Sequence, residues 1–275
     1  MNFHISTRKS LITDFSNLGL ALGDTVIVHT SFSKIGMVAG ESESFIAALL
    51  DSVGESGNVV MPTQSWQLCD PDFLADARLE AHARKQVRDA LPIYDALKTP
   101  SRTMGVVAEH FRTWPGTKRS LHPHRSFAAY GPDAGLITSR HEYSCPLGPD
   151  SPLQALYDLG AKILLVGVGH DKNTSLHLAE YRANLAPKTY VQNGCPELDS
   201  AGNRSWLSWS ELVVDDADFP AVGRAFENDP LSTNRHLVKT GSVGLAPSTL
   251  LPMPELVDFA TNWFNTNRAT SPKSR

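Results

Sequence analysis

Two residue pairs that follow one apolar run of the chain could do acid–base chemistry. His177 and Glu180 are three residues apart, so a helix would place them on one face. A carboxylate beside an imidazole fixes the ring tautomer and raises its basicity, as a general base working near pH 7 requires. The adjacent residues His170 and Asp171 form a rival pair. The residues alone also allow an ordinary helix end that such a His and Glu cap or solvate.

A second candidate site follows the apolar run TVIVHTSF at 25–32. The segment 29–36 combines small hydroxyl residues, backbone N–H groups, a lysine and a glycine, which suits an anion or phosphate cradle. It matches neither a Walker A motif nor GxGxxG. A plain strand-to-helix loop with capping residues is the alternative interpretation.

A third candidate is the loop RSLHPHRS at 119–126, whose two histidines and two arginines could bind phosphate or position a substrate. Ordinary loop residues are the alternative. Two histidines at i and i+2 can ligate a metal, but no carboxylate or cysteine is spaced with them and HExxH is absent, so we predict no metal site. GxSxG and a recognisable catalytic cysteine are absent too. This favours a general base that activates a substrate nucleophile without a covalent enzyme intermediate.

Acidic residues gather in two stretches of the chain. The first lies within 67–98, and the second is the cluster of Asp215, Asp216 and Asp218. Carboxylates that line a cleft would suit a polycationic substrate, whereas most acidic runs are simply solvated surface. The acidic residues of the first stretch that we single out are Asp70, Asp72, Asp76, Glu80 and Asp95.

Composition limits the classes of protein that this chain can belong to. Its 275 residues are 41% hydrophobic and 20% charged, with a formal charge of −4, which is typical of a folded protein without the positive field of a nucleic-acid binder. No apolar run is long enough to span a membrane, and the N-terminus lacks an apolar signal core, so we expect a cytoplasmic protein. The three cysteines contain no CxxC pair and predict no disulfide framework.

Strand-like and helix-like segments alternate along the chain. This alternation predicts an α/β sandwich with helices on both faces of a mixed, largely parallel sheet, in which ligands bind at the carboxyl ends of strands. We expect one domain over 1–265 and a polar tail over 266–275. The expected helices are 7–18, 42–53, 103–111, 151–159, 174–186 and 254–264, the expected strands are 25–32, 58–63, 125–131, 162–169 and 206–214, and 67–98 is expected to hold loops and a short helix.

Six ordered blocks between residues 7 and 264 resemble the aminoglycoside N3-acetyltransferase family, also called the antibiotic N-acetyltransferase family. Any one block alone would be weak, but six in order are specific. The blocks are GDTVIVHTSFSKIG at 23–36, VVMPTQSW at 59–66, LPIYDALKTPSRTMGVVAEHFRT at 91–113, RSLHPHRSFAAYG at 119–131, CPLGPDSPLQALYDLGAKILLVGVGHDKNTSLHLAE at 145–180, and VGLAPSTLLPMPELVDFATNWF at 243–264.

The resemblance implies a three-layer α/β/α fold and transfer of an acetyl group from acetyl-CoA to the amine on carbon 3 of the 2-deoxystreptamine ring of aminoglycosides. It implies that His177 is the base and that Glu180 orients it. The residues that it assigns to coenzyme A are His29, Thr30, Ser31, Phe32, Ser33, Lys34, Gly36, Thr103, Met104, Gly105, Val106 and Ser126, and the carboxylates expected to meet the ammonium groups of the acceptor are Asp70, Asp72, Asp95 and Asp216.

Three other functions stay open on the sequence. The acceptor can be a different amine, such as an amino sugar or a biosynthetic intermediate. His177 can activate water, which would make the protein an acyl-CoA thioesterase. A module that only binds CoA or a sugar is the third, although such a module has little use for an oriented base. The oligomeric state, a homodimer included, is also left open.

Overall fold

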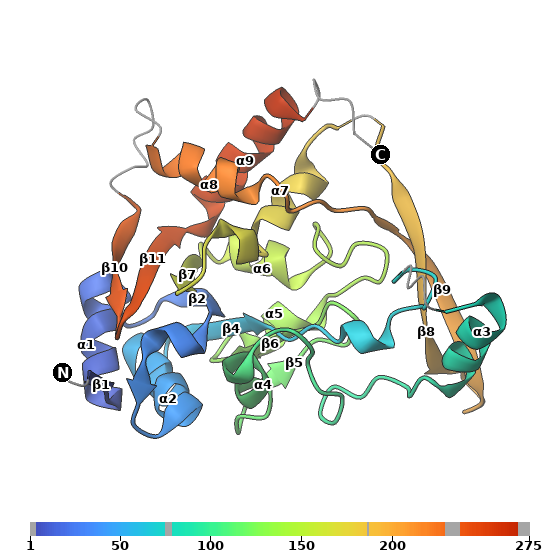
Figure 1. Ribbon diagram of the computed structural model, residues 1–275, viewed down its shortest axis with the longest axis horizontal. Coiled ribbons are helices and arrows are strands. Elements are labelled where there is room, and N and C mark those ends of the chain that lie inside the picture. The colour runs from blue at the N-terminus through green and yellow to red at the C-terminus, as the bar shows by residue number, and fades with distance from the viewer. Residues whose placement is uncertain (1–3, 75–78, 186, 229–236, 269–275) are drawn as a thin grey trace.

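The computed structural model describes residues 4–74, 79–185, 187–228 and 237–268 (Figure 1). Its elements follow each other in the alternating order that the sequence predicts. They are β1 (Ile5–Ser6), α1 (Arg8–Leu18), β2 (Thr25–Thr30), β3 (Met37–Val38), α2 (Glu41–Val53), β4 (Asn58–Pro62), α3 (Ala81–Ala90), α4 (Val106–Arg112), β5 (Lys118–Arg119), β6 (Phe127–Tyr130), α5 (Ala134–Ser139), α6 (Pro152–Asp158), β7 (Lys162–Val166), α7 (Leu176–Arg182), β8 (Tyr190–Leu198), β9 (Arg204–Leu212), α8 (Phe219–Asn228), β10 (Lys239–Val243), β11 (Ala246–Pro252) and α9 (Met253–Asn267), with short 3-10 turns at Phe32–Ile35, Trp66–Leu68 and His170–Lys172.

A seven-stranded mixed sheet forms the centre of the molecule, in the order β10-β11-β7-β2-β4-β6-β5. The three central strands β7, β2 and β4 are parallel, so their carboxyl ends lie at one edge. The strands outside them pair antiparallel, so the expected parallel character holds only for the centre of the sheet. The expected α/β fold with a mixed sheet is confirmed.

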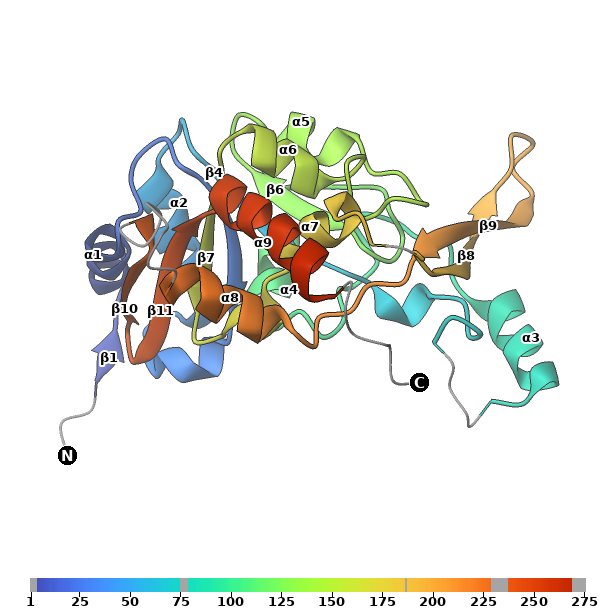
Figure 2. The ribbon, with the colours of Figure 1, turned by 90° about the horizontal axis from the view of Figure 1, so that it is seen from above.

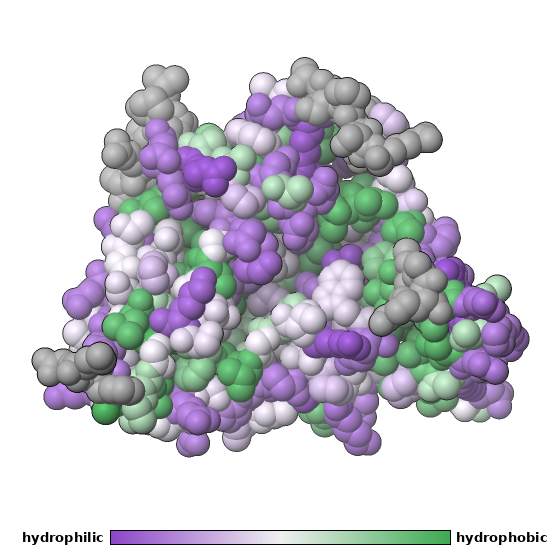
Figure 3. All heavy atoms as spheres, viewed as in Figure 1, coloured by the Kyte–Doolittle hydropathy of each residue, from purple (hydrophilic) through white to green (hydrophobic). Residues whose placement is uncertain are grey.

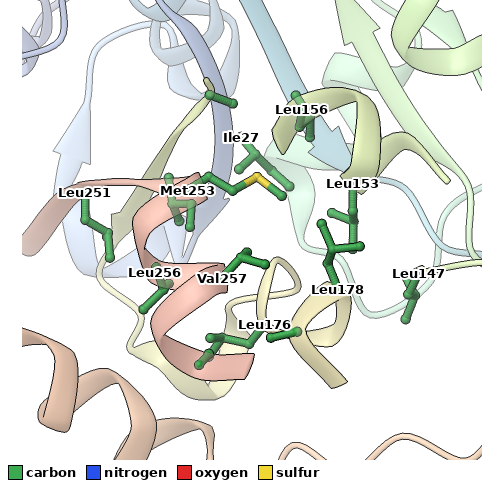
Figure 4. Packing of buried hydrophobic residues seen from close by; sticks show 14 of the residues in the cluster. Ile27, Leu147, Leu153, Leu156, Leu176, Leu178, Leu251, Met253, Leu256 and Val257 are labelled. Carbon is green, nitrogen blue, oxygen red and sulfur yellow. The ribbon is translucent and has the colours of Figure 1, made fainter. Parts of the chain in front are cut away.

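Helices cover both faces of this sheet and bury two apolar clusters against it. On one face α1, α2 and α4 pack their apolar residues, Phe15, Phe45 and Phe111 among them, against the sheet. On the other face α5 to α9 surround a cluster that includes Ile27 of β2 and Leu176 of α7 (Figure 4). Because α7 is anchored in this cluster, its more polar residues are held at a fixed place beside the end of β7.

A separate hairpin of β8 and β9 lies beside the main sheet and extends, together with α3, from one end of the molecule (Figures 1 and 2). The expected strand at 206–214 therefore exists as β9, but its partner is the unforeseen β8 and not the main sheet. Arg204 of β9 donates to the carbonyl of Leu91 at 2.6 Å, which fastens the segment after α3 to the hairpin.

Several element boundaries differ from the expected ones for local physical reasons. The helix expected at 103–111 starts only at Val106, because Thr103 and Gly105 adopt positive φ angles that a helix cannot accept. The helix expected at 174–186 is α7, which ends at Arg182 when Ala183 turns to an extended conformation. At the C-terminus α9 continues to Asn267, so the helix runs into the segment assigned to the polar tail.

The loop 119–126 lies between the main sheet and the hairpin, with all its residues buried except Leu121. His122 accepts hydrogen bonds from the backbone N–H groups of His124 and Arg125, both at 3.1 Å. His124 donates to the carbonyl of Leu68 at 3.0 Å, and its ring packs on Trp209 of β9 at 5.1 Å between centroids. Through these contacts the two histidines have a structural role and hold the β8–β9 hairpin in place.

The face seen in Figure 1 intersperses hydrophilic and hydrophobic side chains without one continuous apolar patch (Figure 3). Among the described residues, the structure contains no helix that is both long and apolar enough to cross a membrane.

We expect the free energy of unfolding to decrease as the pH falls from about 6.5 to 5. Burial lowers the pKa of His29 and of His124 from 6.5 to about 3 and that of His122 well below 6.5. In this window the unfolded chain takes up protons that the folded chain does not bind, so acid favours unfolding. Each such histidine contributes about 1.4 kcal/mol per pH unit. Urea unfolding followed by circular dichroism between pH 5 and 8 measures the slope.

His124→Gln is the matched variant for this measurement. A glutamine amide can still donate toward the Leu68 carbonyl but does not titrate, so the slope between pH 6.5 and 5 should become shallower. A urea midpoint that stays constant from pH 8 to 5 in the unmodified protein would contradict the expectation.

Candidate active site

A cavity of about 1010 Å³ opens at the edge of the sheet where the central parallel strands β2, β4 and β7 end. Loops that leave parallel strands at this edge converge, which makes it the usual ligand site of such sheets. The cavity extends from there to β9 and the segment after it. Its lining residues lie within the segments 28–33, 61–66, 103–108, 168–177 and 211–219, not all of whose residues reach the cavity, and also include Phe73, Arg125 and Val191.

His177 lies in the wall of this cavity and Glu180 lies directly behind it. Nδ1 of His177 and Oε2 of Glu180 are 2.6 Å apart, in a helix-spaced pair on α7. The His177 side chain is 14% exposed and that of Glu180 only 3%. The ring of Phe219 packs against the imidazole at 4.9 Å between centroids. Within the described parts of the chain the hydrogen bond of this cavity-lining ring is at Nδ1, which leaves Nε2 without a protein partner.

The carboxylate of Glu180 has a full set of partners. Oε1 accepts from the backbone N–H of Asp215 at 2.9 Å and from the guanidinium of Arg268, while Oε2 binds His177. Burial raises the pKa of Glu180, but the bonds from His177, Arg268 and Asp215 outweigh it and hold that pKa below its usual value. The group is therefore a carboxylate that holds the imidazole in one orientation.

The rival pair His170 and Asp171 is not formed. Nε2 of His170 binds Oε1 of Glu227 at 3.1 Å, and its Nδ1 contacts the amide of Asn173 at 3.2 Å. The ring is buried against Gly223 of α8, where a Cβ atom would lie 2.1 Å from its Cδ2 atom. Asp171 faces the cavity and pairs with Lys172 at 3.3 Å. His170 is thus a packing residue, and His177 with Glu180 is the pair at the cavity.

The first part of the 29–36 loop lines the cavity. His29, Thr30, Ser31, Phe32 and Ser33 all contribute to its wall, whereas Lys34 and Gly36 do not. Two buried polar atoms of this segment, Nε2 of His29 and Oγ1 of Thr30, have no hydrogen-bond partner among the described residues. Burial is the main cause that lowers the pKa of His29, so this ring is neutral. Such buried polar atoms in a cavity wall fit a polar ligand that supplies the missing partners.

The segment 103–106 forms the opposite wall beside the N-terminus of α4. Thr103, Met104, Gly105 and Val106 all line the cavity. Thr103 has φ +66°, a strained value for a residue with a Cβ, and Gly105 has φ +88°. Strain of this kind is common at ligand sites. Ser126, assigned to the same ligand, lies outside the cavity, where its hydroxyl donates to the carbonyl of Thr63 at 2.9 Å.

Three of the four carboxylates assigned to the acceptor do not reach the cavity. Asp70 and Asp72 form ion pairs with arginines of α3, Asp70 with Arg88 at 2.7 Å and Asp72 with Arg84 and Arg88. The side chain of Asp95 caps a turn by accepting from the N–H of Leu97 at 2.9 Å. Asp216 is the exception, because it is exposed in the cavity wall. Asp76 lies outside the described residues.

The structure adds charged and aromatic residues to this wall that the sequence did not assign to the site. Arg125 and Glu211 both line the cavity and form a buried ion pair at 3.0 Å. Glu211 also accepts from the indole N–H of Trp209 at 2.9 Å, and the guanidinium of Arg125 stacks 4.3 Å above Trp66. The 119–126 motif indicated Arg125, but no local pattern marked Glu211.

In the described ranges no three His, Cys, Asp or Glu side chains are grouped so that they could hold a metal ion. Both histidines of the 119–126 motif make the structural contacts given above, and Nδ1 of His124 is buried without a partner among the described residues. Arg119 of the same motif is buried and donates to the hydroxyl of Ser65 at 2.8 Å, so of the two arginines only Arg125 faces the cavity.

Comparison with known sequences identifies the relatives of this chain. A model of the aminoglycoside 3-N-acetyltransferase family matches residues 27–265. The SPbeta prophage-derived aminoglycoside N(3')-acetyltransferase-like protein YokD of Bacillus subtilis is 38% identical over 95% of this chain and 93% of its own length. Aminoglycoside N(3)-acetyltransferase IX of Micromonospora chalcea is 36% identical over 94% of this chain and 92% of its own length.

Solved structures show the same fold. The crystal structure of YokD from Bacillus subtilis superposes with a TM-score of 0.91, covering 99% of this chain and 97% of its own. The binary complex of AAC-IIIb with CoASH has a TM-score of 0.84 at 29% identity, covering 98% of this chain and 100% of its own. AAC-VIa bound to sisomicin has a TM-score of 0.79 at 30% identity, covering 96% and 99%. This chain is an enzyme of the aminoglycoside 3-N-acetyltransferase family.

Proposed function

We propose that this enzyme transfers the acetyl group of acetyl-CoA to the 3-amino group of the 2-deoxystreptamine ring of an aminoglycoside, by direct attack of the amine on the thioester. The observation that carries the proposal is the placement of His177, with Nδ1 bound to Glu180 and Nε2 available at the cavity. Membership of the family supports the reaction class, and the geometry supports a mechanism without a covalent enzyme intermediate.

His177 acts as the general base in this mechanism. Bound to Glu180, it can take a proton from the acceptor nitrogen while that nitrogen forms a bond to the carbonyl carbon and the carbon–sulfur bond breaks. Glu180 stabilises the positive imidazole that results, at a distance of 2.6 Å. The thiolate is a good leaving group, so strong acid assistance to it is not required. Positioning two substrates in one cavity provides much of the remaining acceleration.

Coenzyme A is proposed to lie along residues 29–33 and 103–106. The unpartnered atoms of His29 and Thr30 and the strained Thr103 support this placement. The AAC-IIIb structure, a binary complex with CoASH, supports coenzyme A as the ligand. Acetyl-CoA is the co-substrate and supplies the thioester. Lys34, Gly36 and Ser126 lie outside the cavity wall and are not part of the proposed contacts.

The acceptor is proposed to lie between His177 and the segment 211–219, where the exposed carboxylate of Asp216 can meet an ammonium group. The sisomicin complex of AAC-VIa supports an aminoglycoside as acceptor. A second candidate is a different amine with fewer cationic groups. The pairing of the cavity carboxylate Glu211 with Arg125, and the aromatic wall of Trp66 and Phe73, favour that alternative.

His177→Ala should lower kcat by about 10²- to 10⁴-fold, because a positioned general base contributes that much. The assay is release of free CoA thiol from acetyl-CoA with gentamicin, kanamycin, tobramycin, apramycin or no acceptor. Affinity for acetyl-CoA, measured by calorimetry, should change little, because the variant removes the base and leaves the walls at 29–33 and 103–106 intact. NMR of the product identifies the acetylated nitrogen.

His82→Ala is the control, since His82 is exposed on α3. If the unmodified enzyme releases thiol without any acceptor, and His177→Ala abolishes that release, the protein is a thioesterase and the proposal is wrong. If the enzyme binds acetyl-CoA tightly but releases no CoA thiol with any of the aminoglycosides, the acceptor is another amine.

Asp216→Asn should raise KM for the aminoglycoside about two- to fivefold and leave KM for acetyl-CoA unchanged. The size corresponds to the loss of one exposed ion pair of at most about 1 kcal/mol. Asp95→Asn makes the same charge change outside the cavity, and its amide oxygen can still cap the turn. An equal change of both KM values, or an equal effect of Asp95→Asn, would contradict a direct contact of Asp216 with the acceptor.

A further inference from the structure

A side chain at the C-terminal end of α9 contacts the His177–Glu180 pair. Arg268 follows directly on α9, and its Nη1 atom donates to Oε1 of Glu180. This is the carboxylate oxygen opposite the one that binds His177. The segment assigned to a polar tail therefore supplies a direct partner of the candidate catalytic pair, although 88 positions separate the two residues in sequence.

Arg268 is itself held in one orientation. Nε donates to Oδ2 of Asp218 at 2.8 Å while Nη2 donates to the other oxygen of the same carboxylate. Nη2 also donates to the carbonyl of Asp215 at 2.6 Å, and the guanidinium stacks 3.9 Å above the ring of Phe264. A planar guanidinium that makes a bidentate contact with a carboxylate and stacks on an aromatic ring has few alternative positions.

We propose that Arg268 is a positioning residue for acetyl transfer: it fixes the carboxylate of Glu180 and, through it, the ring of His177. The proposal rests on the function proposed above, because it assumes that His177 is the base. Arg268 is absent from the cavity lining and so acts through Glu180 without touching a substrate. The chain of contacts is His177, Glu180, Arg268 and Asp218, and it joins α7, the segment after β9 and α9.

The charge of Arg268 gives this role a second consequence. A permanent cation beside Glu180 disfavours a further positive charge on the pair, so it opposes proton uptake. Without Arg268 the pair should take up its proton at a higher pH, whether the proton binds the imidazole or the carboxylate. Other charged or titratable groups near the pair are His29 of β2, Tyr181 of α7, and Asp215 and Asp218 from the segment after β9, while Asp171, Lys172 and Asp216 line the same cavity.

The test is the pH dependence of thiol release with an accepted aminoglycoside. Arg268→Gln should lower kcat by about tenfold and shift the acid limb of the kcat/KM profile to higher pH by about one unit, with KM for acetyl-CoA unchanged. Arg268→Lys keeps the charge but loses the two-pronged contact. The acid limb of Arg268→Lys should therefore lie at the same pH as in the unmodified enzyme, while its kcat should lie between those of Arg268→Gln and the unmodified enzyme.

Arg182→Gln is the matched control. Arg182 also stacks on an aromatic ring, 3.8 Å above Tyr157, and also pairs with a carboxylate, Asp258 at 3.4 Å, but it does not contact Glu180. Its kcat and pH profile should stay within about twofold of the unmodified enzyme. Asp218→Asn gives a second variant that weakens the hold on Arg268 without touching Glu180, and it should lower kcat in the same direction.

A titration of His177 by NMR separates failure of this inference from failure of the proposed function, because it needs no turnover. The pH at which the His177 ring takes up its proton should be higher in Arg268→Gln than in the unmodified enzyme and unchanged in Arg182→Gln. A folded Arg268→Gln with an unaltered ring titration and an unaltered kcat would overturn the inference. An altered titration in an enzyme that acetylates no aminoglycoside would keep the positioning role and reject only the acceptor.

Discussion

The buried carboxylate of Glu180 is the constraint on which the arrangement of the site depends. A desolvated charge is costly unless hydrogen bonds and an opposite charge compensate it. Here the compensation comes from three segments, because His177 lies on α7, Asp215 follows β9, and Arg268 ends α9. These segments must meet at one point for Glu180 to stay ionised. The same requirement brings His177, one cavity wall and the C-terminal helix together.

The central parallel strands explain why this point lies at the cavity. Strands β7, β2 and β4 end at one edge, so the loops that follow them converge there. The apolar cluster that α7 and α9 share (Figure 4) holds α7 in place, and α7 carries His177. The flanking strand β6 runs antiparallel to β4, so the loop that precedes β6 reaches the same edge and brings Arg125 to the cavity. The parallel centre of the sheet thus brings the loops after β2, β4 and β7 together, and the segments before β6 and after β9 complete the cavity wall.

Local patterns in the sequence predicted the parts of the site that depend on local structure. The spacing of His177 and Glu180 indicated their pairing, because helix geometry alone determines which residues share a face. Of the residues that the resemblance assigned to coenzyme A, the structure places 29–33 and 103–106 in the cavity wall, but not Lys34, Gly36 and Ser126. Contacts between distant segments left no such pattern. The composition around Arg268 indicated a polar tail, and the sequence around Asp70 indicated a free carboxylate, although Arg88 of α3 pairs with it.

The two kinds of carboxylate in the cavity wall have different tasks. Glu211 is fully buried and bound by Arg125, Trp209 and Asn193, so its charge is already compensated and it holds the wall together. Asp216 is exposed and has a charge available for a ligand. Asp216 belongs to the same short segment whose Asp215 and Asp218 hold Glu180 and Arg268. Under the proposed function, a change in this segment would act on the acceptor and on the orientation of His177 together, which would tie the choice of amine to the rate of its acetylation.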